Sequence, residues 1–124
     1  MSTVAKTILI VEDDDLNLRV FDDLLQAEGY HTLKNKDGAD AIKVLEVKCP
    51  DLVLMDIKLP SCSGFEVIKN IKSRKKISSI PIIAVTALSM MGDRKKILAS
   101  GFDAYIAKPM SMNQLLTTIK SFIG

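Results

Sequence analysis

The sequence has few of the residues that bind zinc or form disulfide frameworks. It contains two cysteines and one histidine in 124 residues. Cys49 and Cys62 lack the spacing of a metal or redox motif, and His31 alone cannot complete a zinc site. We therefore expect free thiols and a cytoplasmic location, because a reducing compartment keeps thiols unpaired. His31 lies in a polar segment and is expected at the surface.

A large excess of charge and long apolar runs are also absent. The net charge is only +2 at pH 7, which argues against nucleic acid as a partner. The short basic clusters at 74–76 and 94–96 fit solvated helix ends. The first residues, MSTVAKT, lack the apolar core of a secretory signal, and no apolar stretch reaches membrane-spanning length. The composition, 48% apolar and 26% charged, predicts one globular domain over residues 1–124.

The sequence does contain a regular alternation of apolar runs and amphipathic segments. Three short runs, at 8–11, 52–55 and 82–85, are rich in β-branched and aliphatic residues. Such unbroken runs are typical of strands that helices cover on both faces. A weaker run at 104–107 predicts another strand, and the more polar segment 31–34 predicts an edge strand.

Five amphipathic segments follow these runs, and each predicts a helix. They span residues 16–29, 38–48, 65–74, 89–101 and 111–123. Apolar residues recur at helical spacing in the clearer ones. In the first they are Leu18, Phe21, Leu24 and Leu25; in the last they are Leu115, Leu116, Ile119 and either Phe122 or Ile123. The order (βα)5 predicts an α/β fold, a doubly wound, five-stranded parallel sheet with the flavodoxin-like order 2-1-3-4-5.

Polar side chains follow four of the predicted strands. Glu12 and Asp13 come after the first apolar run, and Asp56 ends the most hydrophobic one. Thr86 and Lys108 follow the last two runs. Because the carboxyl ends of parallel strands meet at one edge of the sheet, these groups are expected to line a single crevice. Taken one at a time, the same residues also fit ordinary helix caps, strand ends and surface charges.

The motifs at these strand ends resemble one known family. They are VEDD at 11–14, LMDIKLP at 54–60 followed by Gly64, VTA at 85–87 and KP at 108–109. In this order they resemble the receiver domain of two-component response regulators, in the CheY-like superfamily, and the resemblance covers essentially the whole chain. Asp14 and Asp15 stand outside the predicted site, and one of them is expected to cap the first helix.

The acidic residues predict a site for a divalent cation. Two unit charges about 4 Å apart repel by about 4 kcal/mol at an effective dielectric constant near 20. A hard cation such as Mg²⁺ relieves this repulsion and prefers oxygen ligands. The resemblance implies that Asp13, Asp56 and the backbone carbonyl of Lys58 bind Mg²⁺ directly, and that Glu12 acts through water.

The resemblance also implies a phosphorylation site and a switch. Asp56 is then the nucleophile that accepts a phosphoryl group from a phosphohistidine of a sensor histidine kinase or histidine phosphotransfer protein. Lys108 and Thr86 contact the phosphoryl oxygens, and Tyr105 moves with Thr86. The output is binding to a downstream protein by a monomer or weak dimer. Such a chain is a switch protein and not an enzyme, with chemistry only on itself.

Several neighbouring residues carry further expectations. The resemblance implies a cis peptide bond before Pro109, which would aim Lys108 into the crevice. Lys58 and Leu88 are expected to slow hydrolysis of the phosphorylated aspartate, because neither orients a water as a base would. Met90 or Met91, together with Tyr105, is expected to lie in the partner contact.

Three other functions fit the sequence less well. A phosphohydrolase of the haloacid dehalogenase type has a second aspartate two residues after its nucleophile, where this chain has Lys58. A flavodoxin-like or dinucleotide-binding module has a glycine-rich phosphate loop where this chain has the acidic EDDD. A degenerate receiver that acts as an unphosphorylated adaptor would lack part of the site, and no part is missing.

Overall fold

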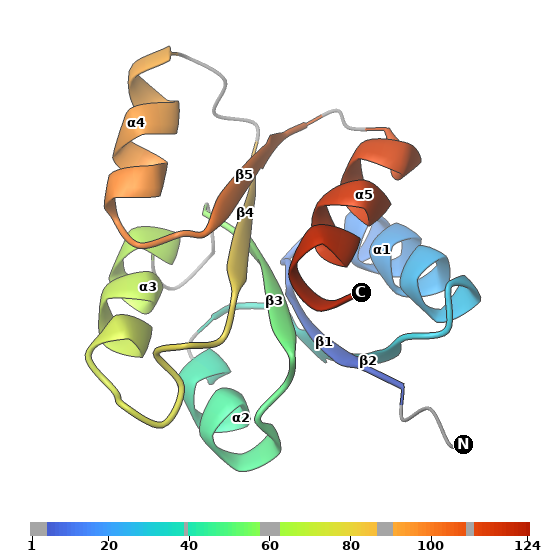
Figure 1. Ribbon diagram of the computed structural model, residues 1–124, viewed down its shortest axis with the longest axis horizontal. Helices are drawn as coiled ribbons and strands as arrows, with labels where there is room; N and C mark the ends of the chain where they lie inside the picture. The colour runs from blue at the N-terminus through green and yellow to red at the C-terminus, as the bar shows by residue number, and fades with distance from the viewer. Residues whose placement is uncertain (1–4, 39, 58–62, 87–90, 109–110) are drawn as a thin grey trace.

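The computed structural model is built around one five-stranded parallel sheet (Figure 1). It describes residues 5–38, 40–57, 63–86, 91–108 and 111–124. The strands are β1 (Thr7–Val11), β2 (His31–Asn35), β3 (Leu52–Asp56), β4 (Ile82–Thr86) and β5 (Ala104–Ala107). Their order is β2-β1-β3-β4-β5, so the predicted fold and strand order are confirmed.

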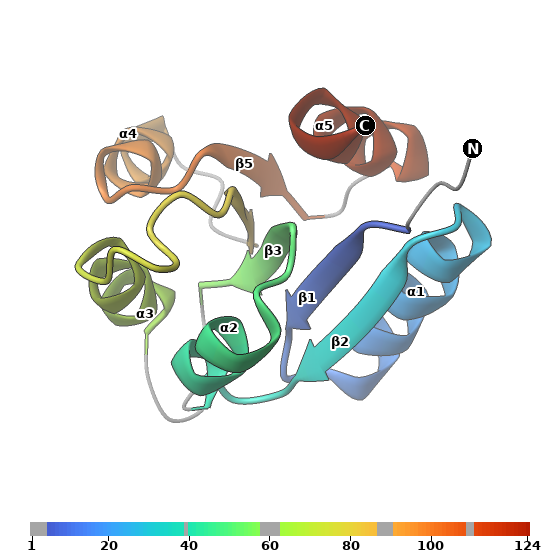
Figure 2. The same ribbon diagram turned by 60° about the horizontal axis from the view of Figure 1, so that its bottom comes forward.

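Helices cover both faces of this sheet. They are α1 (Asp15–Ala27), α2 (Ala41–Lys48), α3 (Gly64–Lys72), α4 (Met91–Ala99) and α5 (Met112–Ile123). Figure 2 shows α1 and α5 on one face and α2, α3 and α4 on the other. Each face has its own apolar core, because successive strand residues point to opposite sides: Ile8 and Ile10 pack with α1 and α5, and Leu9 and Val11 with the other helices.

The register of the strands brings their carboxyl ends to one level. Val11 at the end of β1 is opposite Met55, the residue before Asp56. Thr86 at the end of β4 is opposite Ala107, the residue before Lys108. The polar residues at the carboxyl ends of these strands therefore share one edge of the sheet, as the sequence predicted: Glu12 after β1, Asp56 at the end of β3, Thr86 at the end of β4 and Lys108 after β5.

The first helix begins where the sequence predicted a cap, but the second does not. The carboxylate of Asp14 accepts hydrogen bonds from the backbone N–H groups of Leu16 and Asn17, at 2.8 and 3.2 Å. The predicted start of the second helix at residue 38 was wrong, since α2 begins at Ala41. Gly38 has a φ of +80°, which lies outside the right-handed helical region.

The last helix resolves a choice that the sequence left open. Ser111 caps α5 by accepting a hydrogen bond from the Gln114 N–H at 3.0 Å. Ile123 is half-buried against the core, whereas Phe122 is 39% exposed. The periodicity of the segment admitted either residue, and the packing of α5 selects Ile123.

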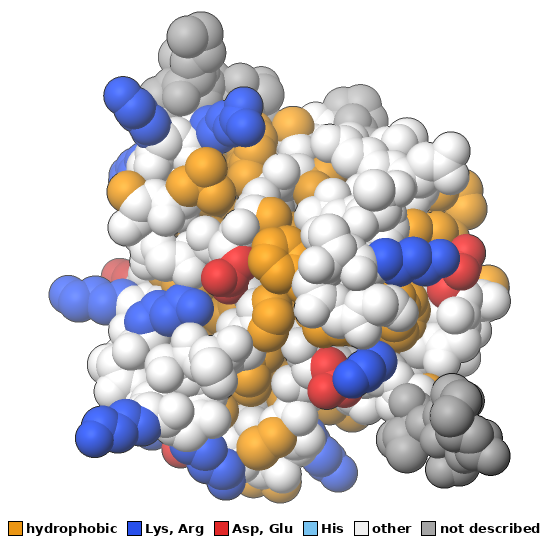
Figure 3. All heavy atoms as spheres, in the orientation of Figure 1, with side chains coloured by type: hydrophobic (Ala, Val, Ile, Leu, Met, Phe, Trp, Pro, Cys, Tyr) orange, Lys and Arg blue, Asp and Glu red, His pale blue; other side chains and the backbone are white. Residues whose placement is uncertain are grey.

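The structure confirms two expectations about single surface residues. His31 is exposed, and Cys49 is an exposed free thiol, whereas Cys62 lies outside the described residues. Figure 3 shows lysines and arginines in several separate places over the side formed by α3 and α4. In the described parts of the chain, every helix is too short or too polar to cross a membrane.

Candidate functional site

Three carboxylates meet at the carboxyl edge of the sheet. One oxygen from each of Glu12, Asp13 and Asp56 lies within 4.8 Å of the other two. Glu12 is 1% exposed and Asp56 is 8% exposed, whereas Asp13 is exposed. The adjacent strands β1 and β3 produce this cluster, because their apolar runs end at the same level. The structure therefore brings together the three acidic side chains that the sequence predicted.

The carboxylate of Glu12 is fixed deep in the cluster. Its Oε2 accepts a hydrogen bond from the Asp14 N–H at 3.1 Å, and its own backbone N–H donates to the Asn35 carbonyl at 3.0 Å. Burial raises the pKa of Glu12, the charge of Asp56 raises it further, and the hydrogen bonds from Lys108 and Asp14 offset part of the effect. Negative charge at this position therefore needs a neighbouring cation.

Lys108 supplies a cation from the opposite side of the crevice. Its Nζ lies 2.7 Å from Oε1 of Glu12 and 3.0 Å from Oδ2 of Asp56. Its backbone N–H donates to the Thr86 carbonyl at 2.8 Å, which ties the end of β5 to that of β4. Burial disfavours the charged ammonium, but the hydrogen bonds to Glu12 and Asp56 outweigh burial and raise the pKa of Lys108. The ammonium is thus charged at neutral pH.

The two predicted switch residues lie on neighbouring strands. Thr86 ends β4 and is fully buried. Tyr105 lies on β5 opposite Ala84 and is partly buried against the core beneath α2, α3 and α4. Their places on the sheet match the prediction, and their part in a switch stays a prediction.

Sequence reasoning missed a positioning residue, Gly64. Its backbone N–H donates to the Ile57 carbonyl at 2.7 Å. A Cβ at this position would lie 2.7 Å from Cα of Ile57 and 3.1 Å from the backbone oxygen of Asp56. The backbone of α3 therefore packs directly against the segment that carries Asp56. The motif contained Gly64, but this close approach appears only in three dimensions.

Some predicted residues lie outside the described part of the chain. These are Lys58, Leu88, Met90 and Pro109, and the side chain of Met91 is likewise not described. The expectations attached to them stay predictions.

Residues 8–120 match the response regulator receiver domain family. This match and the relatives described below show that the chain belongs to that family. Within it, the segments VEDDDLNLRVFDDLLQAEGY at 11–30 and MGD at 91–93 suggest a finer resemblance to the regulator DivK. This finer resemblance is confirmed: the chain is 45% identical over 121 residues to the polar-differentiation response regulator DivK of Brucella ovis, covering 98% of each protein. DivK of Brucella anthropi is 45% identical over 119 residues, 96% of this chain and 97% of that protein.

Solved structures agree with the family and the fold. The receiver domain of the sensor histidine kinase PA1611 from Pseudomonas aeruginosa PAO1 superposes with a TM-score of 0.90 at 33% identity, over 98% of this chain and 99% of that one. That structure holds a magnesium ion in its active site cleft. A CheY-like receiver domain from Methanospirillum hungatei JF-1 gives a TM-score of 0.86 at 31% identity, over 95% and 93% of the two chains.

The donor set of the cluster fits a hard divalent cation. Glu12, Asp13 and Asp56 offer only carboxylate oxygens, and these converge closely enough to share one ion. Mg²⁺ is commonly bound by one or two carboxylates and keeps several of its waters. Asp13 is exposed, so the cluster is open to solvent on the side where these waters would lie. Softer metals favour sulfur or imidazole, and the cluster provides neither.

Proposed function

We propose that Asp56 accepts a phosphoryl group from a phosphohistidine of a sensor histidine kinase or histidine phosphotransfer protein. The reaction depends on Mg²⁺, and its product switches the binding of another protein. The observation that carries this proposal is the meeting of Asp56, Glu12, Asp13 and Lys108 at one edge of the sheet. Because the proposed chemistry acts only on the chain itself, the chain is a switch protein.

The transfer step follows from the position of Asp56. A carboxylate oxygen of Asp56 forms a bond to phosphorus, while the bond between phosphorus and the donor's imidazole nitrogen breaks. The electron pair of the broken bond stays on the imidazole, and Asp56 becomes an acyl phosphate. The strand β3 and the close packing of Gly64 hold the backbone of Asp56 during this attack.

The ion would be held directly by Asp13, Asp56 and the backbone carbonyl of Lys58. Glu12 would hold it through water. When bound, Mg²⁺ would supply positive charge that offsets the negative charge accumulating on the phosphoryl oxygens. Asp13 and Glu12 form no bond to phosphorus. They therefore orient the site and are chemically unchanged by the transfer.

Lys108 changes its partner when the phosphoryl group arrives. Its ammonium already contacts Asp56, and the new oxygens extend from the same carboxylate. A phosphoryl group adds about −1.5 to −2 charge and strong acceptor oxygens. Lys108 therefore exchanges its bond to Glu12 for one to the phosphoryl group, and the Thr86 hydroxyl donates to another oxygen. Tyr105 then follows Thr86, which changes the surface near β5.

An apolar surface beside the cluster supports a protein as the donor. Leu16 and Val20 are 70% and 52% exposed, and they lie one turn apart on α1, directly after the acidic segment. Exposed apolar side chains next to a reactive site suit a docked protein more than a small solute. The name of the relatives suggests a role in polar differentiation. We propose that the chain acts in a cytoplasmic phosphorelay of cell-cycle control.

Phosphorylation by a small donor tests the proposal without the unknown kinase. Wild-type protein treated with acetyl phosphate and Mg²⁺ gains the mass of one phosphoryl group, and protein with EDTA does not. Asp56→Asn gains no phosphoryl group, whereas the matched control Asp23→Asn, which changes a 72% exposed side chain on α1, behaves as wild type. Unmodified wild-type protein under these conditions would favour the unphosphorylated adaptor instead.

A further inference from the structure

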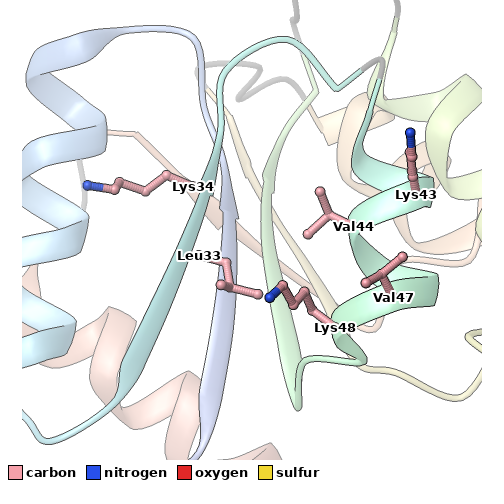
Figure 4. Close-up of a pocket in the computed structure, with 6 residues that line it drawn as sticks. All are labelled: Leu33, Lys34, Lys43, Val44, Val47 and Lys48. Carbon is pink, nitrogen blue, oxygen red and sulfur yellow. The ribbon is translucent and has the colours of Figure 1, made fainter.

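The outer edge of β2 carries a cavity whose lining includes none of the residues with a part in phosphoryl transfer. It has a volume of about 360 Å³ and lies between β2 and α2 (Figure 4). Its lining consists of aliphatic side chains and lysines: Leu33, Lys34, Lys43, Val44, Val47 and Lys48. Neither the family's chemistry nor the proposed switch uses these residues.

The backbone of β2 has hydrogen-bonding groups on this side. The N–H of His31 donates to the Lys6 carbonyl at 2.9 Å, and the carbonyl of Asn35 accepts from Glu12. Both bonds cross to the β1 side of the strand. Because backbone groups of successive strand residues point to opposite sides, those of Thr32 and Lys34 point to the open edge. In the described sheet β2 is an outer strand, so an added strand can bond there.

The cavity provides apolar contacts next to that backbone. Figure 4 shows Leu33 of β2 and Val44 of α2 pointing into the space between the two elements. Val47, one turn after Val44, is 70% exposed. A strand added along β2 would place every second side chain over these three residues. Small aliphatic side chains fit a shallow site of this kind.

The charges around the cavity define the occupant. No described ion pair includes Lys43 or Lys48. Lys34 is different, because its side chain points to the α1 side of the sheet and pairs with Asp22 at 3.4 Å (Figure 4). Two cations beside an apolar site favour acidic residues. A second copy of the chain, paired edge to edge, would instead bring like charges together.

We propose that the surface formed by β2 and α2 binds an extended segment of a partner protein whose side chains toward α2 are aliphatic in the middle and acidic at both ends. The segment adds a strand along Thr32 and Lys34, its aliphatic side chains contact Leu33, Val44 and Val47, and its acidic side chains pair with Lys43 and Lys48. This interaction is independent of Asp56, so the chain can hold such a partner in either phosphorylation state.

An NMR titration tests this surface with a short, capped peptide. Every second residue of the peptide, the set that faces α2, reads Glu, Val, Val, Glu, and serine fills the positions between them. The amides of Thr32 and Lys34 and the methyl groups of Val44 and Val47 are expected to shift on binding. The double variant Lys43→Glu with Lys48→Glu is expected to bind about tenfold more weakly, through loss of two ion pairs and new repulsion. The matched control Lys75→Glu with Lys76→Glu changes the net charge equally at exposed residues and should bind as wild type.

Four results would overturn the proposal. Two concern the peptide: no binding at millimolar concentration, or equal binding of the same peptide with lysine in place of glutamate. The other two are binding to phosphatidylglycerol vesicles in place of the peptide, and self-association that Lys43→Glu with Lys48→Glu abolishes. Thermal melts of both double variants exclude unfolding as the cause of lost binding. The Asp56→Asn protein, which cannot be phosphorylated under the proposed function, should bind the peptide as wild type does. The two proposals therefore fail separately.

Discussion

The ammonium nitrogen of Lys108 lies 3.0 Å from Oδ2 of Asp56, although 52 residues separate them in the sequence. The same nitrogen lies 2.7 Å from Oε1 of Glu12. The side chains of Glu12 and Asp56 are 2% and 10% exposed, so little water solvates them. Lys108 therefore stabilises the site before phosphorylation, in addition to its proposed contact with the phosphoryl group.

Removal of this cation is expected to destabilise the protein. Lys108→Met should lower the free energy of unfolding by about 2 kcal/mol, somewhat less than the loss typical of a fully buried pair, because the side chain of Lys108 is 20% exposed. Urea denaturation in EDTA measures this change. In the same assay, adding Glu12→Gln to Lys108→Met should restore part of the loss, because one of the two uncompensated charges is removed.

A surface lysine provides the comparison for Lys108. Lys120 pairs with Glu28 at 3.4 Å, and its side chain is 52% exposed. Lys120→Met should change stability by less than about 1 kcal/mol, as is usual for an exposed pair. Equal losses in Lys108→Met and Lys120→Met would contradict a special electrostatic role for Lys108.

Asp13 is expected to affect stability and metal binding in opposite directions. Asp13→Asn removes one charge from a crowded acidic cluster, so without metal the protein should gain about 1 kcal/mol. The stabilisation by Mg²⁺ should largely disappear, because a proposed ligand is lost. Thermal melts with and without Mg²⁺ measure both effects. The control Asp15→Asn, in the first turn of α1, should keep the rise in melting temperature on adding Mg²⁺. If Asp13→Asn lowers the melting temperature without metal and keeps that rise, Asp13 is only a helix-end residue.

The sign of a substitution at Gly64 tests the close packing behind Asp56. At an unhindered position in a helix, glycine to alanine usually stabilises by up to about 1 kcal/mol. Here a Cβ would lie 2.7 Å from Cα of Ile57, which is backbone and cannot rotate away. Gly64→Ala should therefore lose about 1–3 kcal/mol of stability and shift the amide resonances of Asp56 and Ile57. A stabilised variant with unchanged resonances would show that the two backbones are not in contact.

The fold and the acidic cluster were predictable because they depend on pattern alone. Apolar runs such as 52–55 identify buried strands, and parallel strands place the residues after them, such as Asp56, at one edge. The start of α2 was not predictable, because periodicity does not reveal the left-handed φ of Gly38. The shared contact of Lys108 with two carboxylates and the approach of Gly64 to Ile57 depend on distances between remote segments.

Asp22 shows the same limit for a charged residue. Its place among the polar residues of α1 resembles a surface position, yet it is only 9% exposed. It accepts hydrogen bonds from Thr32 and from Gln26 Nε2, the latter at 2.7 Å, and it pairs with Lys34. These partners come from one helical turn away and from the neighbouring strand, which sequence spacing alone does not bring together.

The network around Asp22 predicts a pH dependence. Burial alone would raise the pKa of this carboxyl, but hydrogen bonds from Thr32, Gln26 and Lys34 outweigh burial and lower it. A lowered pKa in the folded state stabilises the fold above the carboxyl's ordinary value, and this contribution is lost as pH falls through the folded value. Asp22→Asn should therefore lose about 1 kcal/mol at neutral pH, and its difference from wild type should shrink as the pH falls below 4. Denaturation at several pH values checks this; a difference independent of pH would contradict it.

The most direct test of the central claim locates the phosphoryl group on the chain. Wild-type protein is phosphorylated with acetyl phosphate and Mg²⁺, reduced with borohydride so that the acyl phosphate becomes an alcohol, digested and sequenced by mass spectrometry. Our account predicts that homoserine replaces Asp56 and that Glu12, Asp13 and the other acidic residues are unchanged. Homoserine at another aspartate, with Asp56 intact, would contradict the account.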